Sequence, residues 1–259
     1  MTAHPLESGN PAALPWYNFP ATRHSLDSVW GEAAAELRTT GYSEVPRTLD
    51  HEIPYNALYS YPRLTLSQCC GLDLFAAHTA DVEPFAAPVI SGLAACAGKY
   101  YSHIVTRPGA NLDNPRVAIN NSLSHSGHTA ILGWLANQGV GYYTTSLSGS
   151  HARSILALRR GHADLAAIDA LSWQHLDTTG LHILDSSAPA QAPPFITGRE
   201  SGIPLVELTA VLDRAFKRFG KSIGIIGVVP ISRSEYRGIY KSAVTHGILL
   251  PTHELTAED

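Results

Sequence analysis

The segment that most constrains the fold is RVAINNSLSHSGHTAIL, at residues 116–132. It begins with a short apolar run, Val117 to Ile119, which is typical of a buried strand. A polar turn of Asn, Ser and His follows, and a helical pattern starts near Ala130. This order places a helix N-terminus at the carboxyl end of a strand, where unpaired N–H groups and the helix dipole favour an anion. The segment therefore predicts an α/β fold with a candidate anion site at this turn.

The side chains of this turn allow two interpretations. Ser124 and Ser126 supply hydroxyls, His125 supplies a titratable ring, and Gly127 lets another group approach the backbone closely. A serine that only caps the helix would explain the same pattern. If a charged His125 held the anion, binding would weaken as the pH rises through about 6.5.

Strand and helix patterns alternate along most of the chain, and this alternation predicts an α/β architecture with mostly parallel sheets. Polar turns at Gln68, Ser124 to Gly127, Gly149 to His151, and Asp169 follow predicted strands. Ligands bind at the carboxyl ends of such strands, so this convergence favours a ligand site over a simple cap. The predicted strands cover 14–19, 45–49, 64–66, 100–107, 117–119, 142–147, 164–168, 182–184, 195–197 and 223–230, and the main predicted helices cover 21–40, 148–161, 204–219 and 232–247.

Composition excludes several classes of partner. The net charge of -4 argues against binding to nucleic acid or to an anionic membrane surface. No apolar run is long enough to cross a bilayer, so no membrane insertion is expected. The first residues lack the features of a secretory signal, which predicts a cytoplasmic protein as the sequence is written, or a periplasmic one if a leader has been removed.

The sequence disfavours two other kinds of site. His125, His128 and His151 could approach a metal ion, but no Cys or carboxylate falls at ligand spacing beside them, so no metal is predicted. A Ser-His-Asp hydrolase is disfavoured because the chain lacks a Gly-x-Ser-x-Gly elbow around these serines. No cofactor is expected.

Five segments of the chain, in the order in which they occur, resemble those of a known family. The chain is similar to the phosphate, phosphite and phosphonate substrate-binding proteins of ABC transporters, which have the type II periplasmic-binding-protein fold. The Ser-x-Ser-Gly turn and the His…Gly-x-Ala-Asp…Asp spacing are the most specific parts of the resemblance. The segments are LTLSQCCGLDL (64–74), GKYYSHIVTR (98–107), AINNSLSHSGHTAIL (118–132), SGSHARSILALRRGHADLAAIDALSW (148–173) and GVVPISRSEYRGI (227–239).

The resemblance implies two α/β lobes with a ligand cleft between them. Lobe 1 would comprise residues 14–103 plus 197–259 and lobe 2 residues 104–196, joined by hinge crossings near 101–107 and 193–197. The implied ligand is a small oxyanion or phosphonate, and the implied partner is an ABC-transporter permease. The residues that the resemblance assigns to the ligand are Ser124, His125 and Ser126 on the phosphoryl oxygens, Tyr101 as an aromatic cover, His151 and Asp169 in lobe 2, and Gln68 and Tyr17 in lobe 1.

Two other functions remain open on the same fold. One is an intracellular enzyme, similar to chorismate dehydratases or pyrimidine synthases, with His125 or His151 as acid or base and Asp169 orienting it. The other is a cytoplasmic ligand sensor. The sequence contains no evident pair of a base and an orienting residue, so binding without turnover is the favoured prediction.

Overall fold

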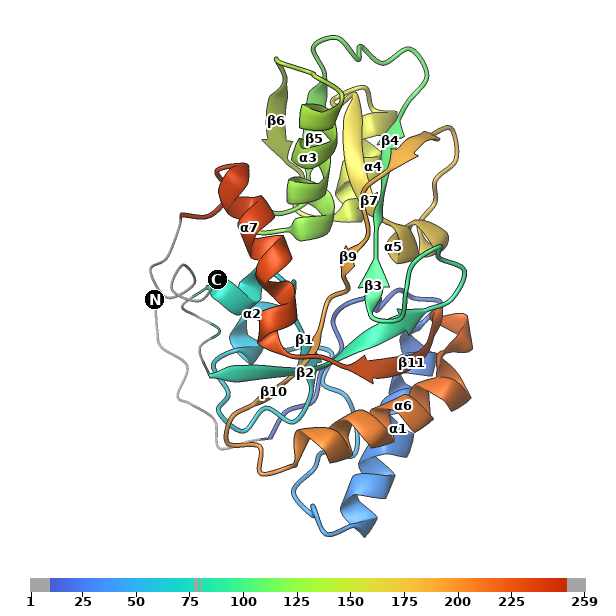
Figure 1. Ribbon diagram of the computed structural model, residues 1–259. Coiled ribbons are helices and arrows are strands. Elements are labelled where there is room, and N and C mark those ends of the chain that lie inside the picture. Colours follow the sequence, from blue (N-terminus) through green and yellow to red (C-terminus); the bar gives the residue numbers. More distant parts are fainter. Residues whose placement is uncertain (1–9, 77–78, 80, 251–259) are drawn as a thin grey trace. The chain divides into compact units, whose positions relative to one another are not determined.

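The computed structural model describes residues 10–76, 79 and 81–250, and the chain separates into two units (Figure 1). Unit 1 contains the chain up to Lys99 together with Gln191–Glu235, and unit 2 contains Tyr100–Ala190 and the chain from Tyr236 onward. The chain therefore passes from one unit to the other after residues 99, 190 and 235.

This division differs from the predicted lobes at the C-terminal helix, which the prediction assigned to lobe 1. Helix α7 (Arg237–Thr245) belongs to unit 2. Ile248, just beyond it, packs against the buried cluster of that unit, and a Cβ placed on Gly133 would lie 3.5 Å from Nε2 of His246. Ile239, Tyr240 and Ala243 of α7 are buried, and the place of this helix in unit 2 depends on contacts between distant parts of the chain, which sequence spacing could not reveal.

Unit 1 is built on a sheet with strand order β1-β10-β2-β11. Its neighbouring strands pair antiparallel. Helix α6 packs on β11 and β2, with Val211, Leu212 and Phe216 buried, and α1 packs on α6. The elements of this unit are α1 (Arg23–Thr39), α2 (Tyr55–Leu58), β1 (Ser67–Gln68), η1 (Asp73–Phe75), β2 (Val82–Ile90), β10 (Phe195–Gly198), α6 (Leu205–Phe219), η4 (Gly220–Ser222) and β11 (Ile225–Pro230).

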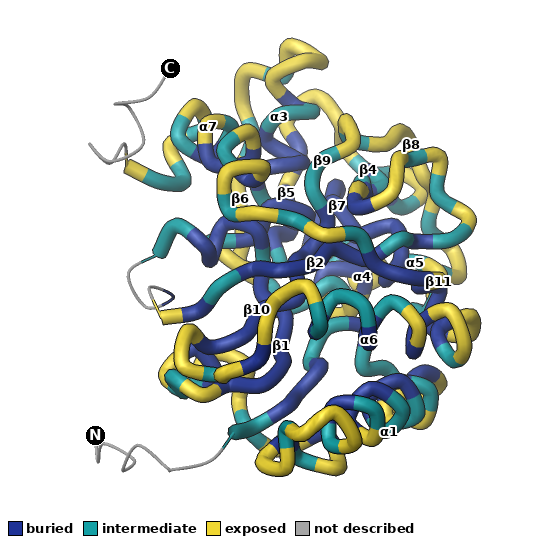
Figure 2. Tube along the Cα trace, turned by 60° about the horizontal axis from the view of Figure 1, so that its bottom comes forward, coloured by how far each residue is buried: buried dark blue, intermediate teal, exposed yellow. Residues whose placement is uncertain are grey.

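The sequence patterns missed strand β2, which lies between β10 and β11 and is largely buried (Figure 2). Pro84 and Pro88 lie within this strand, and proline normally argues against an interior strand because it cannot donate to the ladder. Here Pro84 pairs with Ile196 and Pro88 pairs with Val228. The apolar burial of the strand outweighs the two missing N–H donors.

Two predicted strands near the N-terminus are wrong. Residues 14–19 form turns and irregular backbone, because Pro15 and Pro20 interrupt the run and Tyr17 has a positive φ of 60°. Among the described residues, an isolated bridge near this run joins Ala12 to Leu66, the residue before β1. Residues 45–49 are also irregular, whereas the predicted helix at 21–40 is confirmed as α1.

Unit 2 contains a five-stranded sheet with order β6-β5-β7-β4-β8. Strand β5 pairs parallel with β6 and β7, while β4 pairs antiparallel with β7 and β8. The α/β class is confirmed, but the prediction of mostly parallel sheets is wrong, because β4 pairs antiparallel with β7 and β8 and the strand pairs of the unit 1 sheet are also antiparallel. The strands are β4 (Ser102–Thr106), β5 (Arg116–Ile119), β6 (Thr144–Leu147), β7 (Leu165–Asp169) and β8 (His182–Ser186); β3 (Lys99–Tyr100) pairs with β9 (Ala190–Gln191).

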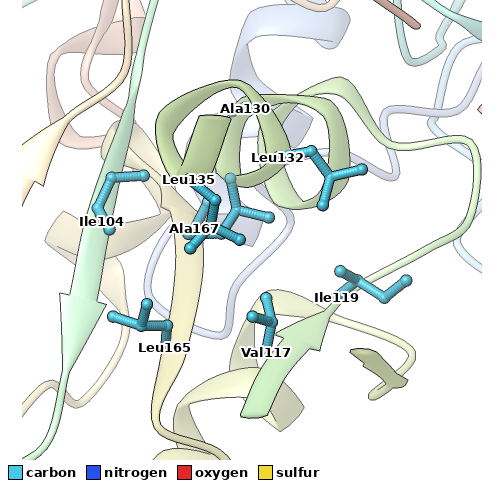
Figure 3. Close-up of a cluster of buried hydrophobic side chains, with 9 residues drawn as sticks. Ile104, Val117, Ile119, Ala130, Leu132, Leu135, Leu165 and Ala167 are labelled. Carbon is cyan, nitrogen blue, oxygen red and sulfur yellow. The ribbon is translucent and has the colours of Figure 1, made fainter. Parts of the chain in front are cut away.

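Both faces of this sheet are covered by helices, and alternate residues of each strand serve opposite faces. Ile104, Val117 and Leu165 pack with α3 (Ala130–Asn137) in one cluster (Figure 3). The next residues along β4 and β5, Val105 and Ala118, pack with α4 (His151–Arg159) in the other. Strands β5 and β7 are therefore held on both sides, which fixes the positions of the loops that follow them.

Candidate functional site

Three helix N-termini meet the same edge of the unit 2 sheet. The parallel strands β5, β6 and β7 lead respectively into η3 (His125–Thr129) and α3, into α4, and into α5 (Ala170–His175). Because parallel strands end at a common edge, the first turns of these helices begin near one another. Their N–H groups and dipoles make this edge favourable for negative charge without a basic side chain.

Ser124 is the N-cap of η3. Its Oγ accepts a hydrogen bond from the Gly127 N–H at 3.0 Å. The cap interpretation is therefore correct for this serine. Asp169 has the same role at the next helix, where its Oδ1 accepts from the Ser172 N–H at 2.7 Å.

Ser126 has a different environment, although it is only two residues away. Its hydroxyl lies 3.1 Å from Nε2 of His151, the first residue of α4, and 3.4 Å from Oγ of Ser124. Ser126 is 9% exposed, so its side chain is largely removed from solvent. The fold thus brings together three of the predicted residues, Ser124, Ser126 and His151.

Asn120 is a member of this cluster that the sequence interpretation missed. Its Nδ2 lies 3.4 Å from Nε2 of His151, and its Oδ1 accepts from the Asn121 N–H at 2.9 Å. A Cβ on Gly127 would lie 2.0 Å from that Oδ1, so the glycine is required here to admit the Asn120 side chain. The sequence feature that could have identified Asn120 is its position directly after the buried strand β5.

Both histidines of the predicted site are neutral at pH 7. Burial lowers the pKa of His125 to about 4, and it lowers the pKa of His151 to about 4 against an opposing effect of the Ala167 backbone. A charged His125 is therefore not the source of anion attraction at neutral pH. Positive potential at this edge comes instead from the helix N-termini.

His125 points to a different region from Ser126. Its ring centroid lies 6.2 Å from that of Tyr100, and the side chain helps to line a cavity of about 590 Å³ that also involves Trp134 of α3 and His246 beyond α7. Neither Ser124 nor Ser126 lines this cavity, so the middle residue of the Ser-x-Ser motif has different neighbours from the two serines.

Tyr101 lies beside Asp169 at the end of the sheet. Its C=O accepts from the Ala170 N–H at 3.1 Å, and its ring lies 5.4 Å from the ring of His103. Ser102 and Asp169 are paired residues of β4 and β7. Tyr101 and Asp169 thus occupy neighbouring strand ends in unit 2.

The other two predicted residues belong to unit 1. Gln68 lies in β1 and is 1% exposed, and its Nε2 has no hydrogen-bond partner among the described residues. Tyr17 is buried, and its C=O accepts from the Thr22 hydroxyl at 2.5 Å. The buried amide of Gln68 is the more suitable polar group for a ligand, because an unsatisfied buried donor is costly.

Within the part of the chain that the structure describes, no group of three or more His, Cys, Asp and Glu side chains is arranged to hold a metal ion. In the same residues, no helix combines the length and apolar character that crossing a membrane requires.

Comparisons with solved structures show that the chain shares its fold with known binding proteins. PhnD1 from Prochlorococcus marinus, in complex with methylphosphonate, has a TM-score of 0.66 at 17% identity, over 88% of this chain and 95% of that chain. XAC2383 from Xanthomonas citri, bound to ATP, has a TM-score of 0.64 at 14% identity, over 92% and 98%. A binding protein component of an ABC phosphonate transporter from Pseudomonas aeruginosa, PA3383, has a TM-score of 0.65 at 13% identity, over 96% and 92%.

Sequence comparison gives the family. A comparison with curated proteins finds no match. The family described as "ABC transporter, phosphonate, periplasmic substrate-binding protein" matches residues 63–236, which is more than half of the chain and includes the whole Ser124 turn, His151 and Asp169. The resemblance and the two-lobed fold class inferred from the sequence are confirmed, and the enzyme alternative gains no support. The chain belongs to the phosphonate family of periplasmic substrate-binding proteins of ABC transporters.

Proposed function

We propose that this protein binds the phosphoryl or phosphonyl group of a small anion at the Ser124–Gly127 turn and releases it unchanged. The observation that carries the proposal is the Ser126 hydroxyl, which lies at the first turn of η3 and within 3.1 Å of His151 at the first turn of α4. A hydroxyl between two helix N-termini is well placed to donate to an oxyanion.

The ligand is expected to be held by neutral donors. With both histidines uncharged at pH 7, the attraction comes from N–H groups and hydroxyls, as at other helix-terminal anion sites. Such a site requires no basic patch, which agrees with the net charge of -4. It also recognises the compact oxyanion group and leaves the rest of the ligand free to vary.

The relatives support this class of ligand. PhnD1 is described in complex with methylphosphonate and XAC2383 bound to ATP, and both ligands carry a phosphorus oxyanion. Members of the matched family are periplasmic components of ABC transporters. We therefore extend the proposal to a periplasmic location and to delivery of the ligand to a permease.

Calorimetric titration with methylphosphonate, phosphate and phosphite tests the proposal. A ligand present at about 100 times its dissociation constant should stabilise the fold by about 2.7 kcal/mol, which a thermal unfolding experiment detects as a raised Tm. Mass spectrometry of the recovered ligand should show no chemical change. If none of these anions binds at millimolar concentration, the proposal is wrong; if one is converted to a product, the enzyme alternative replaces it.

A further inference from the structure

The cavity of about 590 Å³ lies within unit 2, between α3, α7 and the end of β8. Helices α3 and α7 run side by side here (Figures 1 and 2). A cavity of this volume holds a small organic molecule. Asn137, Asp185 and Thr245 line it and are exposed, so a solute reaches the cavity directly from solvent.

Both helices direct their C-terminal ends to this cavity. Asn137 is the last residue of α3 and Thr245 the last of α7, and both line the cavity together with the C-cap residues Gln138 and His246. The C-terminal end of a helix carries a partial negative charge, which acts mainly within the last turn. The electrostatic character of the cavity is therefore opposite to that of the Ser124 turn, where helices begin.

A carboxylate adds to this negative potential. The Trp134 Nε1–H donates to Oδ2 of Asp185 at 2.8 Å, and the Ser186 N–H donates to Oδ1 at 2.8 Å. These bonds, that of Trp134 foremost, lower the pKa of Asp185, so the group is ionised at neutral pH. Among the described residues that line the cavity, Asp185 is the only carboxylate and neither Lys nor Arg occurs. The charge of the lining thus favours a cation and disfavours an anion.

Trp134 supplies an aromatic ring beside the carboxylate. Its Nε1 bond holds the indole against Asp185, so a cation paired with this carboxylate also lies near the ring. Aromatic rings attract cations through their quadrupole, and the indole of tryptophan does so most strongly. An organic ammonium group fits these features better than a metal ion does, because the described residues contain no group of three His, Cys, Asp and Glu side chains that could ligate a metal.

We infer that this cavity is a second binding site, which takes a small organic cation of the quaternary ammonium class with Asp185 as its counter-ion. The site goes beyond the proposed oxyanion function and does not depend on it, because neither Ser124 nor Ser126 lines the cavity.

Choline and 3,3-dimethylbutan-1-ol are the probes that separate charge from shape. The two molecules share one skeleton, in which the alcohol has a carbon atom in place of the quaternary nitrogen of choline. Calorimetric titration at low ionic strength and pH 8, above the ordinary range of histidine, should show choline binding about 10-fold or more tightly than the alcohol. Added salt should weaken the binding of choline and not that of the alcohol, because salt screens exposed charges.

Three variants test the assignment of the counter-ion. Asp185→Asn keeps an oxygen that accepts hydrogen bonds but removes the charge, and it should weaken choline binding by about 2- to 5-fold, the range of an exposed charge pair. The matched control is Asp113→Asn, which removes the same charge from an exposed residue of unit 2 outside the cavity and should bind choline like the wild type. Asn137→Lys adds a positive charge at the C-terminus of α3, where the helix dipole accommodates it, and should weaken choline binding without lowering the Tm.

Several outcomes would overturn the inference. Equal wild-type affinities for choline and the alcohol, or no binding of choline at millimolar concentration, would contradict it and leave the proposed oxyanion function intact. An equal loss of choline affinity in Asp185→Asn and Asp113→Asn would reduce the effect to net charge and also contradict it. Should Asp185→Asn fail to fold, the comparison of choline with the alcohol in the wild type and in Asn137→Lys decides.

Discussion

Acidifying the ligand-free protein from pH 7 to pH 5 is expected to lower its free energy of unfolding by about 2 kcal/mol for each of His125 and His151. Burial lowers the pKa of each ring from 6.5 to about 4. A difference of about 2.5 pH units corresponds to at most about 3.4 kcal/mol per histidine, at about 1.36 kcal/mol per unit. Roughly half of that loss falls between pH 7 and pH 5, because the unfolded ring titrates first.

The number of protons bound by the folded and the unfolded protein decides whether stability rises or falls with pH. Between pH 6.5 and about 4 the unfolded chain binds more protons at these positions than the folded protein does, so stability rises with pH. Above this pH range the two histidines are neutral in both the folded and the unfolded protein, so they do not make the free energy of unfolding depend on pH. The buried carboxyl of Asp164 has its pKa lowered from 3.8 to about 2, mainly by its hydrogen bond with Arg116, so it contributes a slope only at lower pH.

Urea unfolding at pH 5, 6, 7 and 8 measures the effect. His125→Gln and His151→Gln should each remove about 2 kcal/mol of the difference between pH 7 and pH 5, because glutamine does not titrate. His162→Gln is the control, because this side chain is exposed. An unfolding free energy that stays constant between pH 7 and pH 5 would refute the claim that the two rings are buried and neutral.

Three further substitutions test the local structure. Ser124→Ala should lower the free energy of unfolding by about 1 kcal/mol through loss of the cap, with little change in ligand affinity, as chemical unfolding and titration would show. Gly127→Ala should destabilise the fold by about 1–3 kcal/mol, since its Cβ would overlap the Asn120 side chain, and unchanged thermal stability would contradict this. Asp164→Asn should cost about 2–3 kcal/mol at pH 7, because the 2% exposed carboxylate accepts from both Arg107 and Arg116; a calorimetric melt at the wild-type Tm would contradict it.

The strand–turn–helix segments could be predicted from sequence because their patterns are local. The apolar run of β5, the serine turn and the helix after it occur where the periodicity places them. Strand β2 could not be predicted in this way, because its two prolines break the local pattern and its partners β10 and β11 lie far away in the sequence. The assignment of α7 to unit 2 similarly depends on packing between distant parts of the sequence.

The candidate site was predictable in part. The sequence identified Ser126 and His151, but it could not tell which serine caps the helix, because both have the residue type and spacing that a cap requires. Asn120 was missed because its role depends on its distance to a ring 31 residues away. The neutral state of His125 was likewise hidden, since it results from burial and not from neighbours in the sequence.

Calorimetric titration of methylphosphonate into wild-type, Ser126→Ala and Ser124→Ala proteins tests the central claim most directly. If the Ser126 hydroxyl donates to the bound oxyanion, its loss leaves a buried acceptor unsatisfied and should weaken binding by about 1–3 kcal/mol, or about 5- to 150-fold. Ser124→Ala, measured in parallel, should bind nearly as tightly as the wild type but unfold more easily. A Ser126→Ala protein that binds methylphosphonate with wild-type affinity and only melts earlier would contradict the account, because Ser126 would then stabilise the turn and take no part in holding the ligand.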